Sequence, residues 1–259
     1  MRAFFFAVGF WWVSILYVFM AALLALVPGR GGVRWAVKRY THRVVGLMKL
    51  VGIVPDVRGL ERLPPAPFIL APKHSSYGDG FLMYIQFDDV AFVTGDHLER
   101  FPLVPKVLEK LGAIVIDNCG GPEARKDLAA SFAKAAEEKR IVLIYPEGHL
   151  TKVGEHKRIR AGVWHMQETS QWPVVPVATS LGLRWQEQDY AKFPGPAVIE
   201  FLDPIPPGLG EDEMVERLGK AIRTNTDRLI EEGRQWDKAN GVVRKPTKPS
   251  PVVEYEPPT

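Results

Sequence analysis

The N-terminal stretch constrains the fold most, because residues 3–29 contain no charged side chain and are rich in Phe, Trp, Leu and Val. A helix rises about 1.5 Å per residue, so this run is long enough to cross a bilayer core of roughly 30 Å. It exceeds the apolar core of a secretory signal, which is about 7–15 residues, and it ends at Leu26-Val27-Pro28-Gly29 without a small-x-small cleavage site. The sequence therefore predicts a membrane-embedded helix over residues 1–29.

Positive charge follows this apolar run directly. Residues 1–55 contain no Asp or Glu, and six cations lie just after the run: Arg30, Arg34, Lys38, Arg39, Arg43 and Lys49. By the positive-inside tendency this side, with the body attached to it, faces the cytoplasm, which places the protein at the inner membrane. Apolar residues interleave with the cations, so residues 30–55 are predicted to form a basic amphipathic segment on the membrane surface. A helix docked on the protein's own core fits the same pattern.

Two features of the N-terminal half limit the interpretation. Trp11, Trp12 and Tyr17 lie in the middle of the apolar run, so the sequence leaves open whether the helix spans the bilayer or lies in its interface. The residues after 55 hold 26 of the 33 basic side chains together with all 30 acidic ones. The basic character is therefore local, which argues against a nucleic-acid-binding protein. Cys119 is the only cysteine, so no disulfide can form within the chain.

After residue 55 the pattern becomes that of an α/β domain, with short apolar runs separated by helical stretches. The predicted strands are residues 68–71, 90–93, 113–116, 141–145, 174–178 and 197–202. The predicted helices are residues 80–85, 103–111, 123–140, 161–169 and 212–232. Residues 237–259 contain five prolines and few apolar side chains, which predicts a flexible tail and bounds the folded domain at 56–236.

A histidine and a carboxylate five residues apart follow the first predicted strand, in His74-Ser75-Ser76-Tyr77-Gly78-Asp79. Strand ends are where α/β folds place chemistry. A neutral imidazole can take the proton of a hydroxyl that attacks a carbonyl, and a carboxylate on its other ring nitrogen fixes the tautomer and stabilises the imidazolium. On a continuous helix the two side chains would project about 140° apart. They can meet only if His74 lies in a turn and Asp79 near a helix start.

Three further segments follow this one at or near predicted strand ends. They are residues 111–118, ending in Asp117-Asn118, then Tyr145-Pro146-Glu147-Gly148-His149, then Trp172 to Val177 with Pro176 between two valines. In this order and spacing the chain resembles the glycerolipid acyltransferases, that is, the lysophosphatidic acid acyltransferases and their relatives, over roughly residues 50–210. The resemblance implies an α/β fold with a central mixed sheet flanked by helices, as in glycerol-3-phosphate acyltransferase, after an N-terminal membrane helix.

The resemblance also implies an activity. The family transfers a fatty acyl group from acyl-CoA or acyl-carrier protein to a lipid hydroxyl, here the sn-2 hydroxyl of 1-acylglycerol 3-phosphate. The expected partners are the lipid bilayer, the lyso-lipid acceptor and the thioester donor, with no cofactor beyond that co-substrate and no nucleic acid. His74 and Asp79 are the expected catalytic pair. Acceptor-binding or supporting roles fall to Lys73, Ser76, Asn118, Glu147, Gly148 and His149.

The chain departs from the family pattern where an acceptor phosphate is thought to bind. The family has arginines at the positions of Asn118 and Leu150. Arginine offers phosphate two charge-assisted hydrogen bonds from a planar fork, and neither Asn nor Leu can do so. The candidate substitutes are Lys152, Lys157, Arg158 and Arg160. The same cations would also suit a solvated basic loop, so a different acceptor, such as a lysophospholipid or a lyso-amino-acid lipid, stays open.

Two other classes of function compete with this prediction. A metal-dependent hydrolase could use His74, Asp79, Asp117, Glu147 and His149 as ligands, but the sequence has no His-Glu-x-x-His or comparably tight spacing. A catalytically silent lipid-binding relative would fit the missing arginines, although it would have no need to keep both His74 and Asp79.

Overall fold

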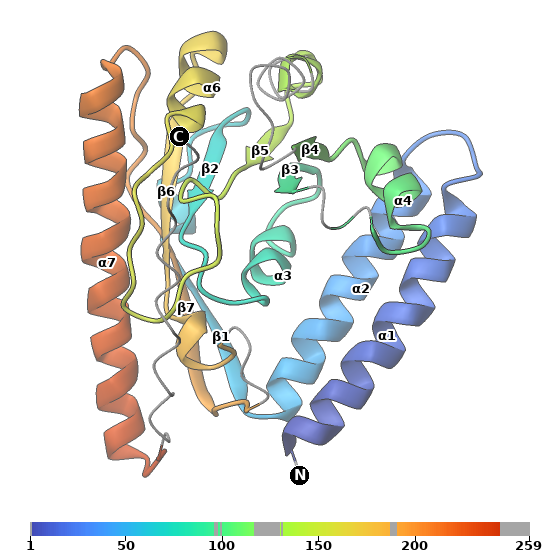
Figure 1. Ribbon diagram of the computed structural model, residues 1–259, viewed down its shortest axis with the longest axis vertical. Helices are drawn as coiled ribbons and strands as arrows, with labels where there is room; N and C mark the ends of the chain where they lie inside the picture. The colour runs from blue at the N-terminus through green and yellow to red at the C-terminus, as the bar shows by residue number, and fades with distance from the viewer. Residues whose placement is uncertain are drawn as a thin grey trace, which may run out of the picture.

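The computed structural model describes residues 2–95, 98, 100–116, 130, 132–186 and 191–243. Within them one seven-stranded sheet has the order β1-β7-β6-β2-β5-β3-β4 (Figure 1). The strands are β1 (Ile53–Arg58), β2 (Ile69–Pro72), β3 (Val90–Gly95), β4 (Ile114–Ile116), β5 (Ile141–Leu143), β6 (Val174–Thr179) and β7 (Gly195–Phe201). Only β6 and β7 pair antiparallel, and the other pairs are parallel. The predicted mixed sheet is therefore confirmed.

Helices cover both faces of this sheet (Figure 1). They are α1 (Arg2–Leu24), α2 (Gly31–Leu50), α3 (Asp79–Tyr84), α4 (Val104–Leu111), α6 (Gly162–Ser170) and α7 (Glu211–Ala239), with short 3-10 turns η1 (Leu60–Arg62) and η3 (Leu181–Leu183). Residues 132–137 are also helical. α6 and α7 lie on one side of the sheet, and α2 and α3 on the other (Figure 1).

Alternate residues of the central strands serve two different cores. Leu70 of β2 packs with α2 and α3, whereas its neighbours Ile69 and Ala71 pack with α6 and α7. Successive side chains of a strand point to opposite faces, so a strand that is buried on both faces reads as a continuous apolar run. This is why the central strands could be recognised in the sequence.

The first two helices form an antiparallel pair beside the sheet (Figure 1). α1 has one face against α2 and the body, through buried Phe6 and Ala21, and leaves the other face exposed. In α2, Val44, Val45 and Met48 are buried in the core shared with the sheet. Of the two arrangements open for residues 30–55, the structure therefore shows the helix docked on the protein's own core.

Three of the six cations that follow the apolar run form ion pairs within the protein. Arg30 pairs with Glu138 at 2.5 Å and Arg34 with Asp89 at 2.7 Å, while Lys38 pairs with Asp88. Ion pairs of this kind reduce the charge that remains for lipid head groups.

Each predicted strand coincides with an observed one to within about two residues, and four of the five predicted helices do so at their first residue. Of the predicted helix 123–140, residues 123–129 and 131 lie outside the described part of the chain, as do residues 244–259 of the predicted tail. Two predictions were wrong. Residues 53–58 form strand β1 instead of ending a surface segment, and α7 continues to Ala239, beyond the boundary expected at 236.

Candidate active site

His74 and Asp79 lie on the turn between β2 and α3. β2 ends at Pro72, and Asp79 is the first residue of α3, so His74 precedes the bend and Asp79 follows it. This is the arrangement that the five-residue spacing requires. The His74 Nδ1 lies 3.2 Å from the Asp79 Oδ2. Asp79 is 1% exposed and His74 is 24% exposed, so the carboxylate is sealed while the imidazole stays accessible from outside.

The backbone of the turn holds the Asp79 carboxylate in place. The N–H groups of Ser75 and Ser76 both donate to Asp79 Oδ2 at 2.7 Å. Ser76 is fully buried, and its hydroxyl accepts a hydrogen bond from the Gly78 N–H at 3.0 Å. Because Asp79 Oδ2 accepts two backbone bonds as a carboxylate, His74 Nδ1 must be the protonated nitrogen of the neutral ring. Nε2 is then the free base.

Tyr145 forms a wall of the site that the sequence analysis did not identify. Its ring stacks on the His74 imidazole with centroids 3.8 Å apart and an interplanar angle of 18°. Among the residues that the structure describes, neither its hydroxyl nor the Asp79 Oδ1 has a hydrogen-bond partner, and both atoms are buried. Burial, and then the Asp79 charge, raise the pKa of Tyr145 well above its usual value. Tyr145 therefore stays neutral and fixes the plane of the imidazole.

A buried ion pair joins the first and third motifs. The Lys73 Nζ donates to both Glu147 oxygens at 2.8 Å and to the Glu155 carbonyl at 2.6 Å. The two side chains are 1% and 3% exposed. With its carboxylate engaged in this way, Glu147 supports the loop. A buried lysine needs such a partner, because an unpaired charge in the interior is strongly unfavourable.

Two further contacts fix the position of His74. The Thr151 N–H and hydroxyl both donate to the His74 carbonyl at 2.9 Å. On the other side, Gly78 packs so closely on Leu181 and Trp185 that an added Cβ would lie 2.8 and 2.9 Å from them. The catalytic turn is thus held between the loop after β5 and the segment after β6. Pro176 lies below it in β6, in register with Ala71 of β2.

The candidate head-group cations gather beside the Glu147 loop. Lys157, Arg158, Arg160 and His149 line a cavity of about 450 Å³ together with Glu147 and the start of α7. Arg160 covers Gly148, whose φ of 73° and lack of a Cβ make room for the guanidinium. Partial burial, and then the Arg160 and Lys157 charges, lower the pKa of His149.

The remaining predicted residues lie apart from this arrangement. Lys152 is exposed, and its backbone N–H binds the Glu155 side chain. Asn118, with Asp117 and Cys119, lies outside the described residues. Among the residues that the structure does describe, no three His, Cys, Asp or Glu side chains gather closely enough to hold a metal ion.

Comparison with known proteins places this geometry in context. A family model described as Acyltransferase matches residues 54–180. A 1-acyl-sn-glycerol-3-phosphate acyltransferase of Pseudomonas aeruginosa is 30% identical over 190 residues, which cover 73% of this chain and 72% of that protein. A protein of the same name from Limnanthes alba is 23% identical over 168 residues, covering 64% of this chain and 60% of the relative.

A solved structure shares the fold. The crystal structure of the 1-acyl-sn-glycerophosphate (LPA) acyltransferase PlsC from Thermotoga maritima superposes with a TM-score of 0.70 and covers 88% of this chain and 98% of that one. The sequence identity is 16%. The likeness therefore concerns the arrangement of the sheet and its helices.

Proposed function

Since the chain belongs to the acyltransferase family, we propose that it transfers a fatty acyl group from a thioester to the sn-2 hydroxyl of 1-acylglycerol 3-phosphate, giving phosphatidic acid. The observation that carries this proposal is the His74–Asp79 pair, sealed on the carboxylate side and open on the imidazole side. The P. aeruginosa and L. alba relatives carry the name of the same reaction. The donor is acyl-CoA or acyl-carrier protein.

The proposed reaction needs one proton relay and no covalent enzyme intermediate. His74 Nε2 takes the proton of the acceptor hydroxyl while the hydroxyl oxygen attacks the thioester carbonyl carbon. Asp79 stabilises the imidazolium that forms, and it stays ionised throughout. The tetrahedral intermediate then collapses, the carbon–sulfur bond breaks, and the departing thiolate takes the proton back from His74. The products are the new ester and a free thiol.

We propose that the acceptor phosphate binds at the cavity beside the Glu147 loop. Arg160 contacts that loop through Gly148 and through the bond from its N–H to the Pro146 carbonyl at 2.8 Å. Leu150 stands where the family has an arginine, so a cation from this neighbouring segment has to replace it. Lysophospholipids or lyso-amino-acid lipids are the second candidate acceptors, because that replacement changes the geometry of the anion site.

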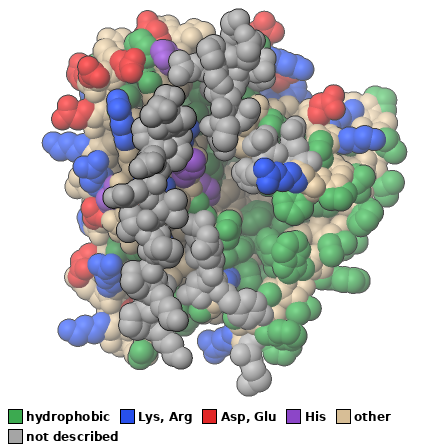
Figure 2. All heavy atoms as spheres, viewed as in Figure 1, with side chains coloured by type: hydrophobic (Ala, Val, Ile, Leu, Met, Phe, Trp, Pro, Cys, Tyr) green, Lys and Arg blue, Asp and Glu red, His purple; other side chains and the backbone are tan. Residues whose placement is uncertain are grey.

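We further propose that α1 embeds the protein in one leaflet of the inner membrane, with the catalytic domain on the cytoplasmic side. α1 is 23 residues long, and an 18-residue stretch of it has a mean hydropathy of 2.1 and is 6% buried. Figure 2 shows hydrophobic side chains gathered on the side of the molecule that α1 and α2 occupy. The packing of α1 along α2 and the body favours an in-plane position over a bilayer crossing. In an in-plane position the exposed apolar face of α1 contacts lipid while its other face stays packed against the protein.

Product analysis by mass spectrometry tests the reaction. Purified protein is given a mixture of lyso-lipids with acyl-CoA or with acyl-carrier-protein thioester, and phosphatidic acid is the expected main product. His74→Ala is expected to lose about 10²- to 10⁴-fold in rate, the usual contribution of a general base. His165→Ala, at an exposed position of α6, is the matched control. Thioester consumption that is equal in wild type and His74→Ala would contradict the mechanism.

Cysteine accessibility tests the membrane arrangement. In a Cys119→Ser background, Ala3→Cys and Leu26→Cys mark the two ends of α1. An in-plane helix exposes both to a membrane-impermeant maleimide from the same side of a sealed vesicle. Labelling of the two ends from opposite sides would show instead that the helix spans the bilayer.

A further inference from the structure

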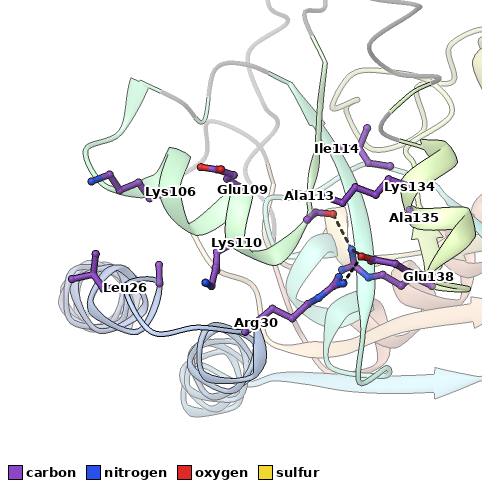
Figure 3. A pocket seen from close by; sticks show the side chains of 14 residues that line it. Leu26, Arg30, Lys106, Glu109, Lys110, Ala113, Ile114, Lys134, Ala135 and Glu138 are labelled. Carbon is purple, nitrogen blue, oxygen red and sulfur yellow. Dashed lines mark hydrogen bonds and ion pairs between the residues drawn. The ribbon is translucent and has the colours of Figure 1, made fainter.

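A second, larger cavity lies away from the catalytic turn. It has a volume of about 690 Å³ and lies between the α1–α2 turn, α4, the start of β4 and the helical segment 132–137 (Figure 3). Its lining includes Leu26 and Gly29 from the turn, Ala113 before β4 and Ala135 from the helical segment. No part of the proposed mechanism uses it.

The sheet separates this cavity from the chemistry. β2, β3, β4 and β5 run parallel, and the catalytic residues His74 and Tyr145 follow the carboxyl ends of β2 and β5. The cavity is lined by Ile114, the first residue of β4, and by Arg140, the residue before β5. These are amino ends of strands. The cavity therefore opens at the opposite edge of the sheet and is distinct from the acceptor site.

Positive charge dominates its lining. Five basic side chains contribute: Arg30, Lys106, Lys110, Lys134 and Arg140. The two acidic ones are Glu109 and Glu138, of which Glu138 already pairs with Arg30 at 2.5 Å. Figure 3 shows Lys110 directed into the space between α4 and the α1–α2 turn, Arg30 extended toward Glu138, and Glu109 on the other side of α4.

Arg140 forms a fixed floor of the cavity, and three lysines line the space beside it. Arg140 is buried and donates to the carbonyls of Leu111, at 2.8 Å, and Gly112, at 3.0 Å, as well as to Asp89, which fixes the turn between α4 and β4. In the described part of the chain, Lys106, Lys110 and Lys134 have no ion-pair partner. An excess of uncompensated ammonium groups around one concave surface attracts an oxyanion, and lysine is a common phosphate ligand.

The rim of the cavity points to the source of that anion. Leu26, which lines the cavity, is 74% exposed, and the next residue, Val27, is 55% exposed. They continue the exposed apolar face of α1, which includes Phe19 and Leu23. If these side chains enter the acyl region of a leaflet, the lysines just beside them lie at the level of the phosphates. Lysines near an apolar boundary extend in this way to the head groups.

We propose that this cavity binds the phosphate of an anionic phospholipid of the membrane itself, at a second site separate from that of the acceptor. The inference rests on the membrane association proposed above. The bound head group anchors the α1–α2 turn against α4 and fixes the depth of the protein in the leaflet. A free inorganic phosphate has the same charge chemistry, but it would not use the apolar rim.

Vesicle partitioning of the full chain tests the proposal. Wild type is expected to prefer vesicles that contain phosphatidylglycerol over vesicles of phosphatidylcholine alone. The combined Lys106→Ala, Lys110→Ala and Lys134→Ala variant is expected to lose about fivefold of this preference per lysine, roughly a hundredfold in all, from the usual strength of a lysine at an anionic membrane. The control removes three exposed cations of α7, through Arg217→Ala, Lys220→Ala and Arg223→Ala. An equal loss in both variants would show diffuse charge and overturn the site.

Protection of Lys110 from a water-soluble acetylating ester, mapped by mass spectrometry, distinguishes the sources of phosphate. Protection by phosphatidylglycerol vesicles, but not by phosphatidylcholine vesicles or by inorganic phosphate at matched ionic strength, supports the lipid site. Protection by inorganic phosphate without vesicles overturns it. Turnover of a water-soluble short-chain acceptor should be unchanged in the lysine variant. Wild type that turns over no acceptor would contradict the proposed function, while the vesicle and protection results would still decide this site.

Discussion

Asp79→Asn is the sharpest perturbation of the proposed mechanism, because it removes one charge and almost no volume. Asp79 Oδ2 accepts the two backbone N–H groups of Ser75 and Ser76, and an Asn oxygen can accept them as well. The Asn NH₂ would then take the place of Oδ1, which has no hydrogen-bond partner in the native turn. The fold should therefore survive, while the imidazolium loses its counter-charge.

The size of the effect follows from the distance between the two groups. With the His74 Nδ1 3.2 Å from the Asp79 Oδ2, a pair of unit charges at an effective dielectric constant near 20 attracts by about 5 kcal/mol. The imidazolium charge is spread over the ring, and a mean separation of ~5 Å gives about 3 kcal/mol. At about 1.4 kcal/mol per factor of ten, kcat/KM should fall by roughly 10²- to 10⁴-fold.

Release of free thiol from the acyl thioester, followed with a thiol-reactive dye, measures this rate. The thiol of Cys119 adds a constant background, which is measured with enzyme in the absence of substrate. Asp88→Asn is the control, because that carboxylate is 96% exposed and pairs only at the surface with Lys38, where such pairs contribute little. A folded Asp79→Asn protein that keeps a tenth or more of wild-type kcat/KM would refute the idea that the Asp79 charge stabilises a protonated His74.

Three more outcomes concern the Lys73–Glu147 ion pair, Tyr145 and Tyr84. Lys73→Met leaves Glu147 buried without its partner and should lower the free energy of unfolding by about 3–5 kcal/mol. The double variant Lys73→Met with Glu147→Leu should recover most of that loss. Equal melting temperatures for the single and the double variant would contradict this expectation. Tyr145→Phe keeps the ring stacked on the imidazole and should keep kcat/KM within a few-fold of wild type, whereas Tyr145→Leu should lower kcat/KM by more than about tenfold. A larger loss in Tyr145→Phe than in Tyr145→Leu would show that the hydroxyl matters more than the ring. Burial raises the pKa of Tyr84 to about 12, so the stabilising contribution of its neutral form, present below about pH 10, should fall away as the pH rises toward ~12, by up to about 3 kcal/mol. Denaturant titrations of Tyr84→Phe should show a shallower alkaline loss than wild type, and parallel curves would exclude Tyr84 as a cause.

The central strands were predictable and the edge strand β1 was not, for a physical reason. β2 and β6 are buried on both faces, so their sequences are apolar except for Thr179 at the end of β6. β1 lies at the end of the sheet and pairs with β7 alone, and it contains Pro55 and Asp56. Proline is tolerated at an edge because no neighbour needs its missing N–H. Only Ile53 of β1 is buried, so its sequence is not a continuous apolar run, and the pattern that identifies β2 and β6 misses it.

The C-terminal boundary was misplaced because its stabilising partner is distant in sequence. In the sequence, Asp237 looks like the start of a polar tail. In the structure Asp237 pairs with buried Arg184, whose guanidinium also lies 5.4 Å from the centre of the Trp236 ring. These contacts keep the last turn of α7 folded as far as Ala239. No local pattern signals a contact across some fifty residues.

The catalytic pair could be located from its spacing, whereas its surroundings could not. The turn between a strand and a helix follows from the Gly-flanked His74-to-Asp79 segment alone. Tyr145 reaches His74 because β5 lies beside β2, and the order of strands in a sheet is not written in any one segment. The same holds for Lys73 and Glu147. Their pairing joins two segments that are 74 residues apart and supports the loop beside the cavity.

A single indole connects the apolar helix to the catalytic turn, and this link gives the membrane contact a role in the chemistry. Trp185 contacts Phe6 and Phe10 of α1 with ring centroids 4.9 and 5.6 Å apart, and its ring would lie 2.9 Å from a Cβ on Gly78. Packed interiors transmit displacement because they have little free volume. If α1 lies in one leaflet as proposed, its depth there fixes the depth of His74. A lyso-lipid presents its sn-2 hydroxyl just beneath its head group, so the base has to stand at that level. A helix docked rigidly on the catalytic domain achieves this, whereas a freely hinged anchor would leave the base at no defined height.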